Sequence, residues 1–393
     1  MKLPARLPDP TQDEIAISSV LAAQIAEEIR IAGGFLGFER FMELALYAPG
    51  QGYYVAGAHK FGAAGDFVTA PEVSPLFGAC LARQCAAVAP LGGQGIIEFG
   101  GGSGRLAIGL LTELRRLGID HLPYAIVELS PELQARQQAL IAAEAPDLLA
   151  HVQWWRGPPV TPWDGVIIAN EILDALPTIR FEISGGHILE QGVGLDDHGA
   201  FDWRLRPATV ALADSVRAAL PESPETYPDG FRSEINPRQS IWLAHLSGFL
   251  RRGVVVLADY GYPRAEYYHP DRDDGTLQCY YRHRVHADPF WFPGVQDLTA
   301  AVDFSALAAA AEVAGFAVMG FAEQAQYLIA CGITDLLAAF VEEHPAAGYR
   351  ATQAVKTLLL PQEMGTRVKF MTLARNYDGA IVGHNLRDAR HRL

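Results

Sequence analysis

Cysteine is scarce in this chain of 393 residues and follows no pattern of a metal or disulfide site. The four cysteines form no C-x-x-C pair: Cys80, Cys85, Cys279 and Cys331. Disulfide frameworks and zinc sites need cysteines at close or paired spacing. His283 and His286 place two more ligand types near Cys279, but nothing supplies a fourth partner. We therefore expect neither a disulfide framework nor a bound metal.

Long apolar segments and runs of basic residues are also missing. No apolar run approaches the ~18 residues that cross a bilayer. The first residues, MKLPARLPDPTQDE, lack the apolar core of a signal peptide and contain acids that are unusual in a transit peptide. The formal charge is −14, whereas nucleic-acid binding needs a basic face. These absences predict a cytoplasmic protein with no stable membrane insertion and no nucleic-acid partner.

Short apolar runs that alternate with helical patterns dominate most of the chain. Half of the residues are hydrophobic, which is enough for a large core. We expect strands near 95–99, 123–128, 151–155, 165–169, 253–259, 316–322 and 367–374. We expect helices near 103–117, 131–145, 236–251, 303–314 and within 333–358. Strands separated by helices predict a mostly parallel sheet with right-handed crossovers, and therefore an α/β fold.

Other regions depart from this rhythm. A capping box at 11–14 opens an amphipathic helix that should end at Gly33-Gly34, and further helices are expected over 38–46 and 75–88. Residues 178–205 carry short alternating runs between Gly-Gly and Asp-Asp-His-Gly turns, which predict antiparallel hairpins. The segments 50–78 and 260–300 are rich in turn formers and aromatic residues. Loops of this length in compact domains are usually lids or binding loops.

The most informative motif is IIEFGGGSGRLA, residues 96–107. An apolar strand ends in Glu98, and Gly100, Gly102 and Gly104 alternate before a helix-like segment. Glycine combines positive φ with no side chain, so this loop lets a ligand touch the backbone. A dinucleotide loop wants a third glycine where this chain has Arg105. The pattern E-x-G-x-G-x-G instead resembles the first motif of Rossmann-like S-adenosylmethionine methyltransferases, and an acid at the strand end suits a cationic cofactor.

The next strand ends in YAIVELSPEL, which places Glu128 at its carboxyl end. A carboxylate there can accept both hydroxyls of an adenosine ribose. Folds that bind NAD also use an acid at this position. Glu128 therefore indicates an adenosine-containing cofactor but does not distinguish S-adenosylmethionine from NAD. A helix N-cap or a solvated acid remains the alternative. Trp154 and Trp155 close the third strand, where they could border an adenine ring or pack in the core.

A second strong signal is VIIANEILDALP, residues 166–177. An apolar strand ends abruptly in Asn170-Glu171, and Asp174 follows three residues later. If a helical turn follows the strand, Glu171 and Asp174 share one face beside the position expected for a transferred methyl group. A substrate cation would offset the cost of burying such side chains. The alternative is that the acids favour a helix N-terminus.

Several long motifs together resemble one family, named for mitochondrial dysfunction protein A. They are GYY, GDFVTAPEVSPLFG, NEILDALP, LADYGYP, DGTLQCYYRHR, GVQDLTAAVDFSAL and EMGTRVKF, and they run from about 33 to 370. Mitochondrial members of that family are complex I assembly-factor methyltransferases that symmetrically dimethylate an arginine of a core subunit. One departure is Gly101, where relatives often have proline.

The resemblance implies a Rossmann-like class I methyltransferase with a seven-strand, mostly parallel sheet, an N-terminal helical cap and an inserted antiparallel hairpin element. It implies cofactor contacts at Glu98, the three glycines, Glu128 and Asn170, and catalysis by Glu171 and Asp174 with Asn170. We accordingly divide the chain into the cap and lid loop (1–92), the cofactor-binding half of the core (93–177), the hairpin element (178–234) and the remainder of the core with its second lid loop (235–393).

Residues that could meet a substrate guanidinium lie mostly in the two lid loops. They are Asp66, Thr69, Pro71, Glu72, Ser74, Asp259, Tyr260 and Asp297. For Asp66, Asp259 and Asp297, hydrogen bonding to a loop backbone is the alternative, and Glu234 could cap the next helix. The predicted function is methyl transfer from S-adenosylmethionine to a protein, with arginine of a complex I subunit as the implied target and a homodimer as one assembly. The rival functions are a non-catalytic assembly chaperone with a vestigial pocket and a nicotinamide-dependent oxidoreductase.

Overall fold

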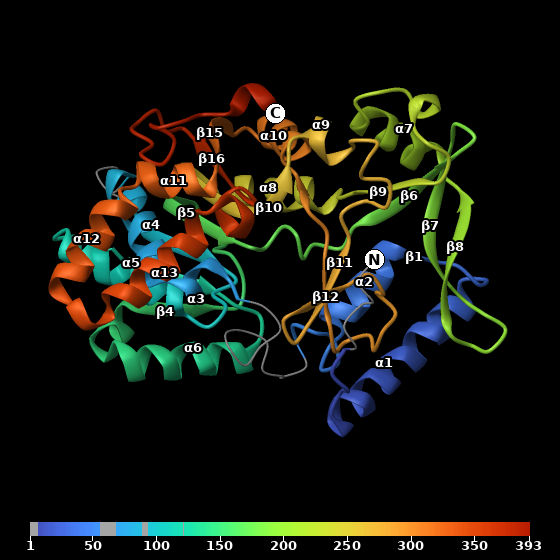
Figure 1. Ribbon diagram of the computed structural model, residues 1–393, viewed down its shortest axis with the longest axis horizontal. Helices are drawn as coiled ribbons and strands as arrows, with labels where there is room; N and C mark the ends of the chain where they lie inside the picture. The colour runs from blue at the N-terminus through green and yellow to red at the C-terminus, as the bar shows by residue number, and fades with distance from the viewer. Residues whose placement is uncertain (1–6, 56–67, 89–92, 121) are drawn as a thin grey trace. The chain divides into compact units, whose positions relative to one another are not determined.

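The computed structural model describes residues 7–55, 68–88, 93–120 and 122–393 (Figure 1). The chain forms two compact units, each built from separated segments. Unit 1 contains residues 1–67, 173–239 and 262–306, and unit 2 contains residues 68–172, 240–261 and 307–393. The chain passes from one unit to the other within single elements, so that α8 (Arg238–Phe249) and α10 (Phe304–Val313) begin in unit 1 and continue in unit 2.

Unit 2 is built on a mixed sheet. Its main path runs in the order β15-β16-β10-β5-β2-β3-β4. The strands are β2 (Gly95–Phe99), β3 (Tyr124–Val127), β4 (Val152–Trp155), β5 (Trp163–Asn170), β10 (Leu250–Tyr262), β15 (Ala317–Glu323) and β16 (Val368–Arg375). The strands β10, β5, β2, β3 and β4 pair in parallel, whereas β16 pairs antiparallel with both β10 and β15. The short strand β14 (Val302–Asp303) lies in the part of the chain that belongs to unit 1.

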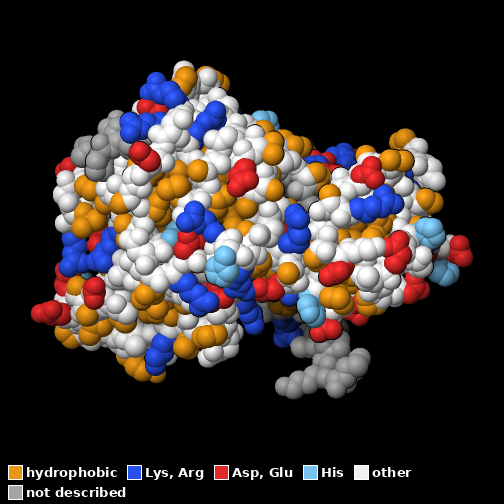
Figure 2. Space-filling view, turned by 90° about the horizontal axis from the view of Figure 1, so that it is seen from above, with side chains coloured by type: hydrophobic (Ala, Val, Ile, Leu, Met, Phe, Trp, Pro, Cys, Tyr) orange, Lys and Arg blue, Asp and Glu red, His pale blue; other side chains and the backbone are white. Residues whose placement is uncertain are grey.

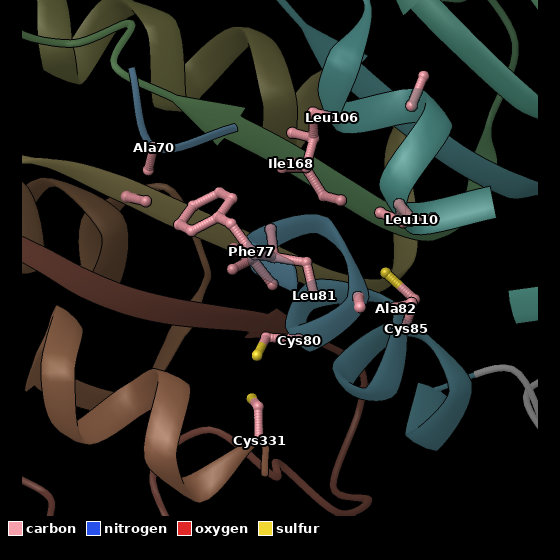
Figure 3. Packing of buried hydrophobic residues seen from close by; sticks show 14 of the residues in the cluster. Ala70, Phe77, Cys80, Leu81, Ala82, Cys85, Leu106, Leu110, Ile168 and Cys331 are labelled. Carbon is pink, nitrogen blue, oxygen red and sulfur yellow. The ribbon is translucent and has the colours of Figure 1, made fainter. Parts of the chain in front are cut away.

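The central strands of this sheet are apolar on both faces, as parallel strands covered by helices must be. The bounds of the unit 2 helices are α3 (Ala70–Val73), α4 (Pro75–Val88), α5 (Arg105–Arg116), α6 (Pro131–Glu144), α11 (Gln324–Ala330), α12 (Ile333–Glu343) and α13 (Gly348–Leu359). Figure 3 shows how one face is filled: Phe77 and Leu81 of α4 pack among Leu106 and Leu110 of α5 and Ile168 of β5. Close packing of α4 on α5 depends on glycine, since a Cβ at Gly78 would lie 2.9 Å from the Leu110 backbone nitrogen.

Unit 1 combines helices with two antiparallel sheets. Its helices are α1 (Gln12–Ile31), α2 (Phe38–Tyr47), α7 (Val210–Ala219) and α9 (Arg264–Tyr267). The larger sheet follows the order β1-β7-β6-β9 with β8 beside β7, and its strands are β1 (Leu36–Gly37), β6 (Ile179–Ser184), β7 (His187–Leu195), β8 (Phe201–Pro207) and β9 (Phe231–Ile235). The predicted hairpins therefore form. The capping box also forms, because Glu14 N donates to Thr11 Oγ1 and Thr11 N donates to Glu14 Oε2.

The segment 260–300 is more ordered than the long loop expected from its sequence. It contains β11 (Gln278–Tyr281), β12 (Arg284–His286) and β13 (Asp297–Thr299), which form a three-stranded antiparallel sheet in the order β12-β11-β13. The chain turns between β11 and β12 at Arg282 and His283, both with positive φ. Neither residue is a turn signal of the kind that glycine or asparagine gives, which explains why the hairpin escaped prediction.

Two features of the described residues bear on the expectations of no membrane insertion and no nucleic-acid partner. Among the described residues, no single helix is long and apolar enough to span a bilayer. The bent pair α11 and α12 passes that test together by length and composition, but several of its apolar residues, including Tyr327, Leu328 and Ile333, are buried in the core of unit 2. On the face seen in Figure 2, the described Lys and Arg side chains lie in small groups among Asp and Glu.

Candidate active site

The order of strands in unit 2 marks one edge of the sheet for ligand binding. From β2 the chain adds β3 and β4 on one side, and β5 and β10 then lie on the other side. Open parallel sheets bind ligands at the carboxyl ends of the strands where this reversal occurs. Phe99 at the end of β2 pairs with Ala169 of β5 and with Val127 of β3. The glycine loop, Glu128 and Asn170 therefore begin at the same edge.

The glycine loop adopts backbone conformations that a side chain would strain. Gly100, Gly102 and Gly104 have φ of 66°, 51° and 94°, the left-handed region that favours glycine. A Cβ on Gly100 would lie 2.3 Å from the Ile172 side chain, whereas a Cβ on Gly102 would meet no atom of the described residues within 4 Å. Gly104 is the N-cap of α5. The loop thus packs tightly against the segment after β5 and leaves open space at Gly102.

Glu98 lies deeper than the sequence suggested. Its side chain is 2 % exposed, and Tyr124 Oη donates to its Oε2 at 2.8 Å. Burial raises the pKa of Glu98 to about 8, with a smaller contribution from Glu128. At neutral pH the carboxyl group is therefore mostly protonated. This environment weakens the charge argument that linked Glu98 to a cationic cofactor, and its role as a ligand stays a prediction.

Glu128 holds a defined orientation directly after β3. Ser130 N donates to its Oε1 at 3.0 Å and Gln137 Nε2 donates to its Oε2 at 3.2 Å. Burial raises the pKa of the Glu128 carboxyl, and these two hydrogen bonds oppose that shift. Each carboxylate oxygen has further acceptor capacity. The helix N-cap that was the alternative role belongs to Ser130, whose Oγ accepts from Leu133 N at 3.3 Å.

The segment after β5 differs from the helical turn considered above. No helix begins there, because Glu171 has φ of 53°. The cause is continued pairing with the neighbouring strand: Glu171 N donates to Ala258 O at 2.8 Å. The expectation that a helical turn puts Glu171 and Asp174 on one face is therefore wrong, and so is the alternative that Glu171 favours a helix N-terminus. Glu171 is half-buried, and its Oε1 accepts long hydrogen bonds from Asn170 Nδ2 at 3.3 Å and Ala70 N at 3.4 Å.

The short helix α3 joins the glycine loop to Glu171. Glu72 on α3 accepts a hydrogen bond from Ser103 Oγ and pairs with Arg105 Nε at 3.0 Å. Arg105 also forms a two-bond pair with Glu144 on α6. Ala70, two residues before Glu72, supplies the backbone N–H to Glu171. Arg105, which breaks the dinucleotide pattern, therefore fastens the segment that reaches Glu171.

The other predicted residues of unit 2 have structural partners. Asp259 is 1 % exposed, and it accepts from Ile172 N at 3.1 Å and Tyr260 N at 2.8 Å. Buried Ser74 accepts from Leu76 N in the first turn of α4. Thr69 is the N-cap residue of α3, and Pro71 lies in its first turn. For Asp259 the structure thus displays the loop-backbone bonding that was the alternative to a guanidinium contact.

The remaining acids belong to unit 1 or lie outside the described residues. Asp297 is buried, and Tyr54 Oη donates to its Oδ1 at 3.0 Å. Burial raises the pKa of Tyr54 well above its usual value, and Asp297 adds to this shift. Asp174 is also buried, and its backbone carbonyl accepts from Ala300 N at 2.9 Å. Asp66 lies outside the described residues. Glu234 caps no helix, since it pairs with buried Arg180 at 3.0 Å.

Comparisons with known proteins agree with this geometry. Residues 80–322, more than half of the chain, match a family model described as "Putative S-adenosyl-L-methionine-dependent methyltransferase". The chain belongs to this methyltransferase family. A protein from Burkholderia thailandensis described as a "likely methyl transferase", whose crystal structure contains S-adenosyl-homocysteine, is 42% identical, with a TM-score of 0.93 over 99% of this chain and 100% of that one.

Two curated relatives of this methyltransferase are named protein arginine methyltransferases. Mouse protein arginine methyltransferase NDUFAF7, mitochondrial, is 29% identical over 85% of this chain and 79% of its own length. The Drosophila melanogaster homolog is 26% identical over 98% of this chain and 91% of its own length.

The residues of this methyltransferase fit the cofactor of its family. The open space at Gly102 is a cradle that a Cβ would fill. Asn170 Oδ1 is buried and has no hydrogen-bond partner among the described residues, although a buried polar atom normally has one. The carboxylate of Glu128 is fixed beside the cradle by Gln137, which also bonds to Gly102 O.

Sequence reasoning missed Gln137 on α6 and the fastening role of Glu72. Gln137 is fully buried, yet it lies in the polar sequence PELQARQQ, whose neighbouring glutamines give no hint of which one faces the core. Trp154 Nε1 donates to Gln137 Oε1 at 2.9 Å, so Trp154 acts through Gln137. For Glu72, the available signal was Arg105, a basic residue at the start of α5 where an acid would be favoured.

Proposed function

We propose that this methyltransferase modifies an arginine side chain of a protein substrate. Two observations support the proposal: the names of the curated relatives and a half-buried carboxylate, Glu171, that follows the β5 strand at the edge where the cofactor cradle lies. The second carries the proposal, because a carboxylate at this position can pair with a cationic acceptor such as guanidinium. The parallel pairing of β10, β5, β2, β3 and β4 further supports a class I methyltransferase sheet.

We assign cofactor binding to residues at three neighbouring strand ends. The backbone of Gly100, Gly102 and Gly104 would line the cofactor, Glu128 would accept from the ribose hydroxyls, and Asn170 would use its unpaired Oδ1 as an acceptor. The bound cofactor supplies an electrophilic methyl group. Glu98, which accepts a hydrogen bond from Tyr124, stays a predicted cofactor contact.

The proposed acceptor, the guanidinium group of arginine, is a poor nucleophile that the enzyme must activate. Guanidinium is planar, delocalised and protonated at neutral pH. A carboxylate that binds one edge of the group concentrates electron density on one nitrogen and fixes its direction. We assign this task to Glu171, with Asn170 Nδ2 holding the carboxylate through the 3.3 Å bond. A catalytic role for Asp174 stays a prediction that rests on the family resemblance.

The proposed substrate is an extended segment of a respiratory complex I subunit before assembly. The proposed place of the reaction is the cytoplasm of a bacterial cell. The family resemblance supports the complex I target. The sequence of the two long segments 50–78 and 260–300, which contain Thr69, Pro71, Tyr260 and Asp297, favours a polypeptide acceptor over a small metabolite. A homodimer is proposed as the assembly.

A methylation assay tests this function directly. Arginine-containing peptides or unassembled subunits should gain label from labelled cofactor, whereas free arginine, nucleic acids and small phenols should not. S-adenosyl-homocysteine, and not NADH, should raise the Tm of the wild-type protein. Turnover on a small metabolite with no activity on any protein would contradict the proposal. Cofactor binding without turnover on any substrate would favour the assembly-chaperone function.

A further inference from the structure

Gln137 is the polar residue that joins three parts of the cofactor edge. Its side chain is 0 % exposed on α6. Its Nε2 donates to Gly102 O at 3.0 Å and to Glu128 Oε2 at 3.2 Å, while its Oε1 accepts from Trp154 Nε1 at 2.9 Å. One amide therefore connects the glycine loop, Glu128 after β3 and Trp154 of β4.

The glycine loop lies against the residue that carries this amide. A Cβ on Gly104 would lie 3.4 Å from the Gln137 Cα, and a Cβ on Gly101 would lie 3.2 Å from its Nε2. The distance at Gly104 is an ordinary van der Waals contact, and a Cβ on Gly101 would lie closer still to the Ile126 side chain of β3, at 2.6 Å, so the loop packs between β3 and α6. The departure from proline at Gly101 thus occurs where the loop touches Gln137.

We propose that Gln137 is a positioning residue for the cofactor, because its amide fixes the Glu128 carboxylate and the Gly102 carbonyl in one arrangement. The inference rests on the proposed role of Glu128 as the ribose acid. Both Nε2 hydrogens are used inside the protein, so Gln137 leaves the outer lone pairs of Glu128 to the ribose. It acts before binding, by removing the cost of orienting the carboxylate.

The Gln137 bond also stabilises the charged form of Glu128. Hydrogen bonds to a carboxylate favour ionisation, and the bond from Gln137 opposes the effect of burial on the pKa of Glu128. Glu98 is a titratable neighbour on β2 that interacts with Glu128, and backbone hydrogen bonds at Ser130 and Leu129 also oppose the effect of burial on the pKa of Glu128. Loss of the Gln137 amide should therefore raise the pH at which Glu128 gains a proton.

The chain offers a matched control on the same helix. Gln134 Nε2 donates to the backbone carbonyl of Glu128 at 2.7 Å and does not touch its carboxylate. Gln137→Met and Gln134→Met remove the same chemical group from neighbouring turns and keep side-chain length. Only the first removes a bond to the titrating group.

Calorimetry with S-adenosyl-homocysteine between pH 5 and 9 tests the inference. Gln137→Met should weaken affinity roughly tenfold at pH 7, the loss expected for a charge-assisted hydrogen bond. The acid limb of its affinity profile should shift to higher pH, because a protonated Glu128 can no longer accept both ribose hydroxyls. Gln134→Met should leave the position of that limb unchanged. With turnover measured, Gln137→Met should raise KM for the cofactor more than it lowers kcat.

The outcomes separate this inference from the proposed function. If Gln137→Met and Gln134→Met have the same affinity profile, the positioning role is wrong. Glu128→Gln tests the underlying assignment: unchanged affinity in that variant would contradict the ribose acid itself. If Gln137→Met does not fold, Trp154→Phe serves instead, since it removes only the bond to Oε1. That variant should weaken affinity by about two- to threefold, and no change would contradict the network.

Discussion

Glu171 directly follows β5 and Asp259 lies within the neighbouring parallel strand β10, yet the two acids have different surroundings. Ala258 within β10 pairs with Asn170 at the end of β5, so each acid comes directly after one residue of this pair. Asp259 is buried and accepts from the backbone of Ile172 and Tyr260 at 2.8–3.1 Å. Glu171 is half-buried, has φ of 53°, and accepts at 3.3–3.4 Å. Asp259 therefore holds the segment after β5 through hydrogen bonds to the backbone, and Glu171 is the acid that this segment places at the edge of the sheet.

The largest effect should follow substitution of Glu171. Glu171→Gln keeps the shape of the side chain and removes its charge, so methyl transfer to an arginine peptide should fall by about 100-fold or more. Affinity for S-adenosyl-homocysteine and Tm should stay close to the wild-type values, because loss of a transition-state interaction lowers kcat. Single-turnover assays with calorimetry measure both quantities. A wild-type rate in Glu171→Gln would show that Glu171, like Asp259, has a structural and not a catalytic role.

A second effect concerns the cradle on the other side of β5. Gly102→Val places a branched side chain in open space at φ of 51°, where it would occupy the volume assigned to the cofactor and strain the loop. We expect affinity for S-adenosyl-homocysteine to fall by about 100-fold, since both the lost contacts and the strain oppose binding. Gly118→Val, at another left-handed glycine with open space, controls for strain alone. Equal affinity in both variants would place the cofactor elsewhere.

A third prediction concerns Glu98, an acid at the same edge that is buried more completely than Glu171. Its folded pKa of about 8 lies above the usual value of 4.5, so the folded state holds the proton more tightly than the unfolded state. Stability from this group is therefore full below pH 4.5 and is lost as pH rises toward 8. Glu98→Gln should remove this loss, on the order of a few kcal/mol between pH 5 and 9. Urea unfolding at several pH values measures it. Parallel pH profiles for both proteins would mean that Glu98 is ionised in the fold.

The smallest effect should come from substitution of Asp259. Asp259→Asn retains one acceptor oxygen, so one of the backbone N–H groups of Ile172 and Tyr260 loses its partner. The free energy of unfolding should fall by about 1–2 kcal/mol, measured by urea denaturation. Methyl transfer should fall less than in Glu171→Gln. A larger loss of turnover than of stability would show that Asp259 touches the reacting groups.

The sequence was sufficient where a strong local pattern dictated the structure. Buried strands with helical partners, the capping box at Thr11 and the glycine loop all follow from residue chemistry, and the α/β class is confirmed. The sequence was not sufficient where pairing between distant strands decided the geometry. Glu171 looked like a helix start, but its N–H bonds to Ala258, which lies on another strand. Gln137 was hidden because its role depends on where α6 rotates, which its polar neighbours do not specify.

The position of β16 in the sheet sets the order in which unit 2 can be completed during synthesis. β16 (Val368–Arg375) lies between β10 and β15 and pairs with both. Until residues 368–375 have been synthesised, β10 and β15 have no strand between them. Their unpaired edges are then templates for aggregation. A chain truncated before Val368 would retain the glycine loop, Glu128 and Glu171 in its sequence. It would nevertheless be expected to need a chaperone or to precipitate.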